Sequence, residues 1–256
     1  MAVENTEKED KLLIAKAEDA MRSAERKYMT MTVGFLNPRQ RTLLKKSVFV
    51  SVDLSFEFEG GYPEAERTLC VFKPEYADFS IDEFISVIQI DGRDLDGLTH
   101  RDYLGSLMAL GIVRENIGDI IVTPNGAFIF VKAHIADYIL QNLTKIGRRG
   151  ITCRACPCGE AELPKPKAKE VRGTVASVRL DAVLAHICGI SRGKAVDLIT
   201  KGLVCVNFEV VLSVSYQIKQ GDLLSVRGIG RIRIAEIGGI TRKGRTGILA
   251  ERYTVQ

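Results

Sequence analysis

Residues 179–202 of this chain read RLDAVLAHICGISRGKAVDLITKG and contain two short amphipathic patterns. The first pattern has apolar residues at helical spacing: Leu180, Val183, Leu184 and Ile187. It stops at Gly189, and the second pattern begins at Ser191 and stops at Gly202. Serine is favoured just before the first turn of a helix, and glycine just after the last. We therefore predict two short helices that bury their apolar sides together.

Cations stand at both predicted helix starts. Arg179 precedes the first helix, and Arg192 and Lys194 lie in the first turn of the second. A cation at a helix N-terminus opposes the helix dipole, whereas an anion such as phosphate is attracted there. We therefore hypothesise that Arg179, Arg192 and Lys194 face phosphate groups. Lys201 is less diagnostic because a cation is favoured at a helix C-terminus.

The charge of the chain is divided unevenly along its length. Residues 163–256 contain 16 Lys and Arg against 7 Asp and Glu, a net charge of +9, whereas residues 1–162 carry −5. Predicted strands follow the second helix at 204–206, 210–212, 223–227, 231–237 and 248–253, and a short strand precedes the first helix at 174–178. A basic, arginine-rich end is typical of a protein that binds a polyanion.

This region resembles the S-four domain, a small RNA-binding domain first recognised in ribosomal protein S four. The matching residues are Arg179-Leu180-Asp181, Ser191-Arg192, Ala195, Leu198-Ile199, Gly202, Val204-x-Val206-Asn207, Ser213, Tyr216 and Gly221-Asp222. The resemblance implies that the paired helices dock on structured RNA. The RNA-binding residues that we carry over are Arg179, Asp181, Ser191, Arg192, Lys194, Lys201, Asn207 and Phe208.

Phe208 departs from the pattern of that family, which usually has glycine after the asparagine of the hairpin. Phenylalanine is disfavoured where a turn requires positive φ. Either the turn differs, or Phe208 is displayed for stacking. Further along, Arg242, Lys243 and Arg245 lie in a glycine-flanked turn. We favour a phosphate clamp there over a solvated hairpin tip because the turn follows an RNA-binding module.

The N-terminal part predicts a helix and strand subdomain. Apolar residues at steps of three and four predict a helix over 5–28, and Asn37 followed by Pro38 predicts the start of another helix that runs to Lys46. Alternating apolar residues predict a long half-buried strand over 48–58, and 69–72 is a second strand candidate.

A β-α-β-β-α-β order follows. The strands are expected at 84–90, 119–123, 127–131 and 150–153, and the helices at 99–110 and 133–146. The order fits a ferredoxin-like, RNA-recognition-type plait. RNA-recognition motifs stack bases on aromatic side chains of the sheet, but we expect Phe128 and Phe130 to be core residues instead.

The fold class is therefore α+β. Residues 1–75 form an N-terminal helix and strand subdomain, 76–160 the plait, 161–173 a linker rich in proline and lysine, and 174–256 an S-four type RNA-binding domain with basic C-terminal strands. A linker of this composition cannot bury an apolar face.

Three upstream stretches extend the resemblance over nearly the whole chain. They are Phe35-Leu36-Asn37-Pro38-Arg39-Gln40, Tyr62-Pro63-Glu64-Ala65-Glu66-Arg67, and Leu98-Thr99-His100-Arg101-Asp102-Tyr103-Leu104-Gly105-Ser106-Leu107 through Gly118-Asp119-Ile120. They resemble the YlmH family of bacterial RNA-binding proteins. This resemblance implies a non-enzymatic protein that binds ribosomal RNA and tRNA on the large ribosomal subunit. It also implies a link to the rescue of stalled translation and to cell-division loci.

The residues themselves reveal no catalytic constellation. No Walker-type phosphate loop is present, and His100 beside Asp102 favours a capping role over catalysis because no activated nucleophile accompanies it. The alternatives are an RNA-modifying enzyme of the pseudouridine-synthase type, which would use the same domain for docking, and a cell-division-associated interaction protein. S-four domains are often appended to such enzymes.

No cofactor and no small-molecule substrate are expected. Cys153, Cys156 and Cys158 have metal-ligand spacing but lack a fourth ligand, so we favour free thiols over a metal site. Since no stretch approaches the ~20 apolar residues that cross a bilayer, and residues 1–7 are polar with no signal-peptide pattern, we expect a cytoplasmic protein that does not bind membranes.

Overall fold

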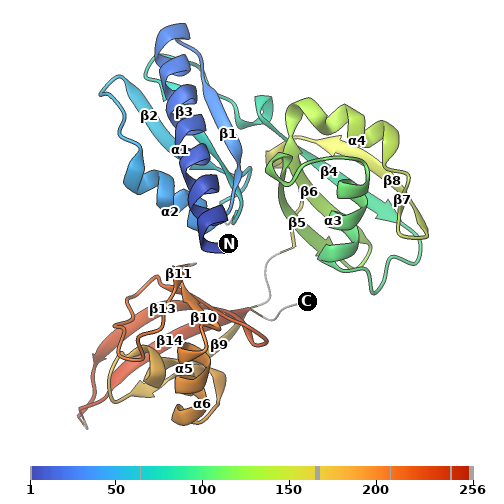
Figure 1. Ribbon diagram of the computed structural model, residues 1–256. Coiled ribbons are helices and arrows are strands. Elements are labelled where there is room, and N and C mark those ends of the chain that lie inside the picture. Colours follow the sequence, from blue (N-terminus) through green and yellow to red (C-terminus); the bar gives the residue numbers. More distant parts are fainter. Residues whose placement is uncertain (1, 64, 165–167, 208, 243, 254–256) are drawn as a thin grey trace. The chain divides into compact units, whose positions relative to one another are not determined.

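The apolar patterns of the sequence build two units, Met1–Pro164 and Lys165–Gln256. The computed structural model describes residues 2–63, 65–164, 168–207, 209–242 and 244–253, which include both units (Figure 1). The boundary between the units lies in the stretch where the sequence predicts a linker. Both units combine helices with antiparallel sheets, in agreement with the predicted α+β class.

The first unit begins with a long helix on a small sheet. Helix α1 (Ala2–Lys27) and helix α2 (Pro38–Ser47) accompany strands β1 (Met31–Leu36), β2 (Leu54–Glu59) and β3 (Thr68–Pro74). The strands pair in the antiparallel order β1-β3-β2. Helix α1 lies along this sheet (Figure 1). Its residues Leu13, Ala17 and Ala24 are buried in one cluster with Cys70 and Phe72 of β3.

Two expectations for this region were wrong. Only 54–59 of the expected strand 48–58 is a strand, because residues 48–53 form a connection in which the Leu54 amide donates to the Ser51 carbonyl. Val52, which we expected on the buried face, is 98% exposed. Strand β1 was not predicted. Its apolar run is interrupted by Gly34, which has φ +50 where the pairing with β3 shifts register.

The second half of this unit contains the predicted β-α-β-β-α-β order. Its elements are β4 (Ile85–Gly92), α3 (His100–Ala109), β5 (Ile117–Thr123), β6 (Gly126–Lys132), α4 (Ala136–Asn142), β7 (Lys145–Ile146) and β8 (Arg149–Cys156), with short 3-10 turns at Ile81–Glu83, Arg114–Asn116, Ala133–Ile135 and Cys158–Glu160. The strands lie in the order β5-β6-β4-β8-β7 with antiparallel neighbours. The helix expected over 133–146 is shorter, because its last residues form β7.

Both faces of this sheet are covered. Tyr103 and Leu107 of α3 and Ile139 of α4 are buried with Ile88 and Ile129 on one face. On the other face, Phe128 and Phe130 are buried with Phe35, Leu69 and Val71 of the N-terminal sheet. Phe128 is 8% exposed and Phe130 is fully buried. The core role that we expected for these two residues is confirmed, since buried rings cannot stack on bases.

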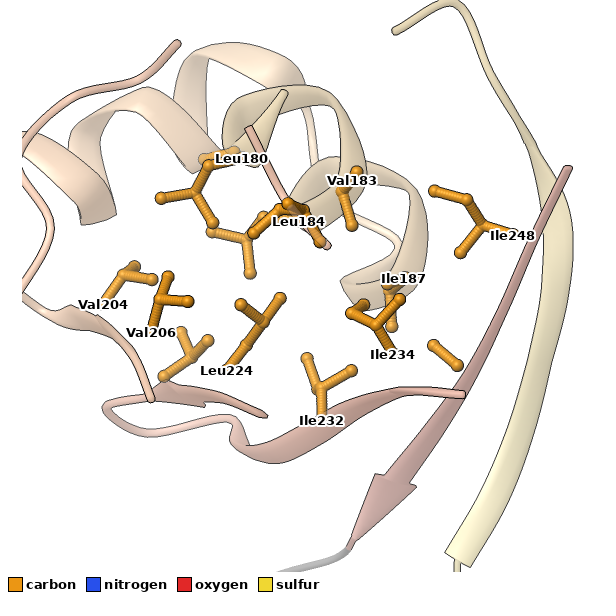
Figure 2. Close-up of a cluster of buried hydrophobic side chains, with 14 of the residues drawn as sticks. Leu180, Val183, Leu184, Ile187, Val204, Val206, Leu224, Ile232, Ile234 and Ile248 are labelled. Carbon is orange, nitrogen blue, oxygen red and sulfur yellow. The ribbon is translucent and has the colours of Figure 1, made fainter. Parts of the chain in front are cut away.

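The second unit is a curved sheet that carries two helices. Its elements are β9 (Ala168–Val175), α5 (Leu180–Cys188), α6 (Arg192–Thr200), β10 (Val204–Val206), β11 (Glu209–Val210), β12 (Leu223–Val226), β13 (Gly230–Ile240) and β14 (Thr246–Tyr253). The sheet order is β11-β10-β12-β13-β14-β9. Figure 2 shows Leu180, Leu184 and Ile187 of α5 pointing toward Leu224, Ile232 and Ile234 of the sheet.

Residues 168–173, which we expected in the linker, belong to β9. The strand pairs antiparallel with β14 from Val175 opposite Thr246 to Ala168 opposite Tyr253. The residues around this segment are rich in proline and lysine, and its strand hydrogen bonds come from β14, some 80 positions along the chain. The local composition therefore could not predict the strand. Of the strand expected at 174–178, only 174–175 belong to a strand, as the end of β9.

Candidate nucleic-acid interface

A short turn joins the end of α5 to the start of α6, and a contact between Arg192 and Asp181 links the two helix starts. Gly189 ends α5 with φ +65 and ψ +36, a left-handed conformation that glycine adopts without strain. Two residues later Ser191 caps α6, and its side-chain oxygen accepts a hydrogen bond from the Lys194 amide at 3.2 Å. Arg179 is the N-cap residue of α5 and Arg192 is the first residue of α6.

One buried carboxylate binds both arginines. Arg179 donates from Nε to Asp181 Oδ1 at 3.1 Å and from Nη2 to Oδ2 at 3.4 Å. Arg192 donates from Nε to Asp181 Oδ2 at 2.9 Å. The Asp181 side chain is 4% exposed, whereas the side chains of Arg179 and Arg192 are 36% and 58% exposed. The three groups together carry a net charge of +1, and the positive groups lie outermost.

The electrostatics of this cluster keep Asp181 ionised. Burial would raise the pKa of the Asp181 carboxyl, but hydrogen bonds from Arg192 and Arg179 outweigh burial and lower the pKa below its ordinary value. Among the described residues, the Nη atoms of Arg192 donate no hydrogen bond. A guanidinium has five N–H donors, so Arg192 can bind Asp181 with Nε and still present donors to an external anion.

These positions change part of the sequence hypothesis. Arg179 and Arg192 lie on one side of the unit, as expected, but an internal carboxylate already neutralises part of their charge. Asp181 is among the residues that we predict to bind RNA, and the structure places its carboxylate behind the two arginines. Its carboxylate is buried and orients the arginines, so it is not available at the surface.

The other cations expected on the helices are at the surface. Lys194 and Lys201 are exposed, and Lys201 is the C-cap residue of α6. Ser191 is also exposed, but its oxygen is occupied as a helix cap. The helix pair therefore presents Arg192 and Lys194 in one turn of α6, with Arg179 tied to Arg192 through their shared carboxylate.

The hairpin residue Asn207 has an internal role. It has φ +48, and its side-chain Nδ2 donates to Asp222 Oδ1 at 2.8 Å while its Oδ1 accepts from the Leu223 amide at 2.9 Å. Asp222 also accepts from the Lys219 amide at 2.8 Å. Asn207 therefore supplies the left-handed residue of this turn and fixes β10 to β12. Phe208 lies outside the described residues.

The basic turn between β13 and β14 is partly anchored. Arg245 donates from Nε to the Thr174 hydroxyl at 2.9 Å and from Nη2 to the Thr174 carbonyl at 2.6 Å. It thereby ties the turn to β9, a contact that the sequence did not predict because Thr174 is 71 positions away. Arg242 is exposed, and Lys243 lies outside the described residues. Arg242 is therefore the member of the expected clamp that is exposed and has no partner among the residues that the structure describes.

Alternation along β13 places further cations on the outer face of the sheet. Ile232 and Ile234 are buried, whereas Arg231 and Arg233 are exposed. Side chains of a strand alternate between faces, so this signal was readable in the sequence. Arg233 lies opposite Glu251 in the pairing with β14, which makes this face mixed in charge and weaker as a phosphate site than the helix starts.

Neither a metal cluster nor a membrane span is found in the part of the chain that the structure describes. No group of three or more His, Cys, Asp or Glu residues there could hold a metal ion. Cys158 is buried and Cys153 donates from Sγ to the Leu143 carbonyl, and burial raises the pKa of these thiols to about 12 and about 11. No described helix is long and apolar enough to cross a bilayer.

Known proteins resemble both halves of the chain. Residues 74–160 match the family described as "Putative RNA-binding domain in YlmH", and residues 178–224 match the S4 (S-four) domain. The chain is 32% identical over 258 residues to "Ribosome-associated protein quality control protein P2" of Bacillus subtilis (strain 168), with 96% of each chain covered. It also resembles the structure described as "Cell division protein ylmH from Streptococcus pneumoniae", with a TM-score of 0.50 and 24% identity over 61% of this chain and 95% of that one. The last match concerns the fold alone. The extent of the B. subtilis match, together with the match to the YlmH RNA-binding domain, shows that the chain belongs to the YlmH family.

Proposed function

We propose that this protein binds structured RNA of the ribosome through the starts of α5 and α6. Its partners in this proposal are ribosomal RNA and tRNA on the large ribosomal subunit, and its setting is quality control of stalled translation in the cytoplasm. The name of the B. subtilis relative supports the setting, and the two RNA-binding domain matches support the partner.

The cluster around Asp181 is the observation that carries the proposal. Arg179 and Arg192 come from different helices, and Asp181 holds both guanidinium groups in place before any ligand arrives. Lys194 extends the positive surface within the same turn of α6. A cation that is already oriented loses less conformational entropy when it binds a phosphate. The buried carboxylate thus serves as a positioning group for an RNA-binding surface.

Phosphate recognition of this kind depends on salt. Each neutralised phosphate releases condensed counterions, so affinity falls steeply as salt rises. Contacts to phosphates and sugars position a protein on a folded RNA without reading its bases. We therefore expect recognition of RNA shape, with affinity that falls by orders of magnitude over a fourfold rise in salt if several phosphates are contacted.

Sedimentation of a cell lysate through a sucrose gradient tests the proposal. The wild-type protein should co-migrate with large ribosomal subunits, and a Lys194→Gln, Lys201→Gln double variant should shift toward free protein. These lysines are exposed, so the variant should keep the fold. The matched control is Arg26→Gln with Lys27→Gln, which removes two exposed cations from the first unit.

The outcomes separate the proposal from its alternatives. Migration of wild-type protein at the top of the gradient, at low and moderate salt, would contradict ribosome binding. Equal co-migration of both double variants would contradict the helix surface. RNA recovered with the protein should contain no new modified nucleoside by mass spectrometry, whereas a new one would favour the RNA-modifying enzyme.

A further inference from the structure

The three upstream stretches that resemble the YlmH family converge at one place in the first unit. Asp119 accepts hydrogen bonds from the Tyr62 hydroxyl at 2.8 Å, the Glu66 amide at 2.7 Å and the Arg67 amide at 3.1 Å. Arg67 in turn donates from Nη2 to the Phe35 carbonyl at 2.6 Å and from Nε to the Ile117 carbonyl at 2.9 Å. These bonds hold Tyr62, Glu66 and Arg67 in place after β2, and RNA binding by the second unit does not account for them.

A pocket opens beside this fixed loop. It has a volume of about 390 Å³, and its lining includes Arg41 of α2, Phe58 and Glu59 at the end of β2, Tyr62 of the loop, and Thr68 of β3. Ligand pockets commonly have ~300–1,000 Å³. Gly60 and Gly61 form part of the wall and allow the loop to pass close to its neighbours, since a Cβ at Gly61 would meet the Phe130 ring.

Arg41 is the unsatisfied cation of this pocket. Its side chain is half-buried, and no described residue accepts a hydrogen bond from its guanidinium or forms an ion pair with it. Burial lowers the pKa of Arg41, and the more distant charge of Asp119 only partly opposes this effect. Arg39 on the same helix provides a contrast, because it binds the Asp10 carboxylate through both Nη atoms at 2.8 and 2.6 Å. A desolvated arginine without a partner indicates a place for an external anion.

The other walls of the pocket suit a flat group with hydroxyls. Phe58, Tyr62 and Glu59 line the pocket. The Phe58 ring has Lys45 Nζ over it at 5.4 Å from the centroid, and the Tyr62 ring packs on Phe130 with 4.9 Å between centroids, so each ring has its other side for a ligand. Burial and the charge of the neighbouring Glu57 raise the pKa of Glu59. Thr68 also lines the pocket, and its hydroxyl is buried without a partner among the described residues. A carboxylate in the same lining argues against a simple polyanion.

We propose that this pocket binds a nucleoside monophosphate. The phosphate pairs with the Arg41 guanidinium, the base lies against Phe58 and Tyr62, and the ribose hydroxyls donate to Glu59. The nucleotide can be free or can be the 5′-terminal residue of an RNA, since both present the same phosphate and base. The site lies in the first unit, so it is separate from the helix surface of the proposed function.

Isothermal titration calorimetry on the full chain tests this site with the four nucleoside 5′-monophosphates. At least one should bind saturably, and the corresponding nucleoside and inorganic phosphate should each bind about tenfold more weakly or worse, because each lacks one half of the contacts. Arg41→Gln should weaken binding about tenfold or more. Arg39→Gln, on the same helix but paired with Asp10, is the matched control and should leave binding unchanged. Circular dichroism confirms that both variants are folded.

A second set of titrations separates the two sources of the nucleotide. A short single-stranded RNA with a 5′-phosphate should bind in an Arg41-dependent manner if the source is an RNA end, and the same RNA with a 5′-hydroxyl should bind less. Binding of the monophosphate alone would identify a free nucleotide as the source. The proposal is wrong if neither probe binds, or if Arg41→Gln and Arg39→Gln bind equally well.

The Lys194→Gln, Lys201→Gln variant separates this proposal from the proposed function. It should bind the monophosphate like the wild-type protein even where it no longer co-migrates with ribosomal subunits. A loss of monophosphate binding in this variant would place the nucleotide on the helix surface and overturn the pocket.

Discussion

Arg192 donates a hydrogen bond from Nε to Asp181 Oδ2 at 2.9 Å and so ties the first residue of α6 to the first turn of α5. Asp181 is buried, and Arg179 binds the same carboxylate from the cap of α5. The angle and spacing of the two helix starts therefore depend on an anion inside the protein. The surface that we propose for RNA exists before RNA arrives.

Asp181→Asn should destabilise the second unit, because it removes the charge that both arginines bind. The loss of free energy of unfolding should be only about 1–2 kcal/mol, because both arginines are partly solvated. The pKa of Asp181 is lowered in the folded protein. Its contribution is therefore complete above the ordinary carboxyl pKa of ~3.9 and disappears as the pH falls through the lower folded value. Urea denaturation of both proteins at several pH values measures this. A stability difference that grows toward acidic pH would contradict the assignment.

Gly173→Ala should destabilise the second unit by about 1–3 kcal/mol, because overpacking forces neighbouring groups apart. A Cβ at position 173 would overlap the ring of His186, whose Nε2 is buried without a described partner. Combining the change with His186→Ala removes the obstacle, so the two changes together should cost less than their sum by about 1–2 kcal/mol. A double-mutant cycle from chemical denaturation measures the coupling. Strict additivity would show that β9 does not pack on α5 as described.

Asn207→Ala should cost about 2–3 kcal/mol, since it removes two side-chain hydrogen bonds and leaves a residue with a Cβ at φ +48. Asn207→Gly removes the same bonds but tolerates positive φ, so it should cost about 1 kcal/mol less. Thermal denaturation followed by circular dichroism compares the two variants. If glycine were the more damaging replacement, the left-handed conformation would not be the constraint at this turn.

Arg67→Lys should destabilise the first unit by about 2–4 kcal/mol despite keeping the charge. The guanidinium of Arg67 reaches the carbonyls of Phe35, Arg114 and Ile117, and burial lowers its pKa to about 10. A lysine ammonium cannot span three carbonyl acceptors that come from two separate segments, β1 and the stretch that enters β5. Arg22→Lys, on the exposed side of α1, should change stability by less than about 0.5 kcal/mol. Equal effects of the two changes in chemical denaturation would contradict the role of Arg67.

Local signals carried much of the fold. Asn37 with Pro38 and Gln40 forms the capping box that starts α2, and β5 and β6 pair across the short Pro124-Asn125-Gly126 stretch. These features need only neighbours within a few residues. The connection at 48–53 was mistaken for a strand because alternation alone cannot tell whether a partner strand runs alongside. Strand β9 was mistaken for linker for the converse reason, since its partner β14 lies far along the chain.

The sequence by itself determined the two short helices, the cations at their starts and the resemblance to an RNA-binding family. Helix caps, hydrophobic periodicity and charge depend only on residues that are close together in the sequence. Only the tertiary structure decided that Asp181 is an internal counter-ion, that Arg245 is anchored to Thr174, and that Arg41 borders a pocket without a partner among the described residues. Each of those facts depends on which distant groups fold against a side chain. Burial and hydrogen bonding set the charge state and the freedom of a polar group, and neither can be computed from its neighbours in sequence.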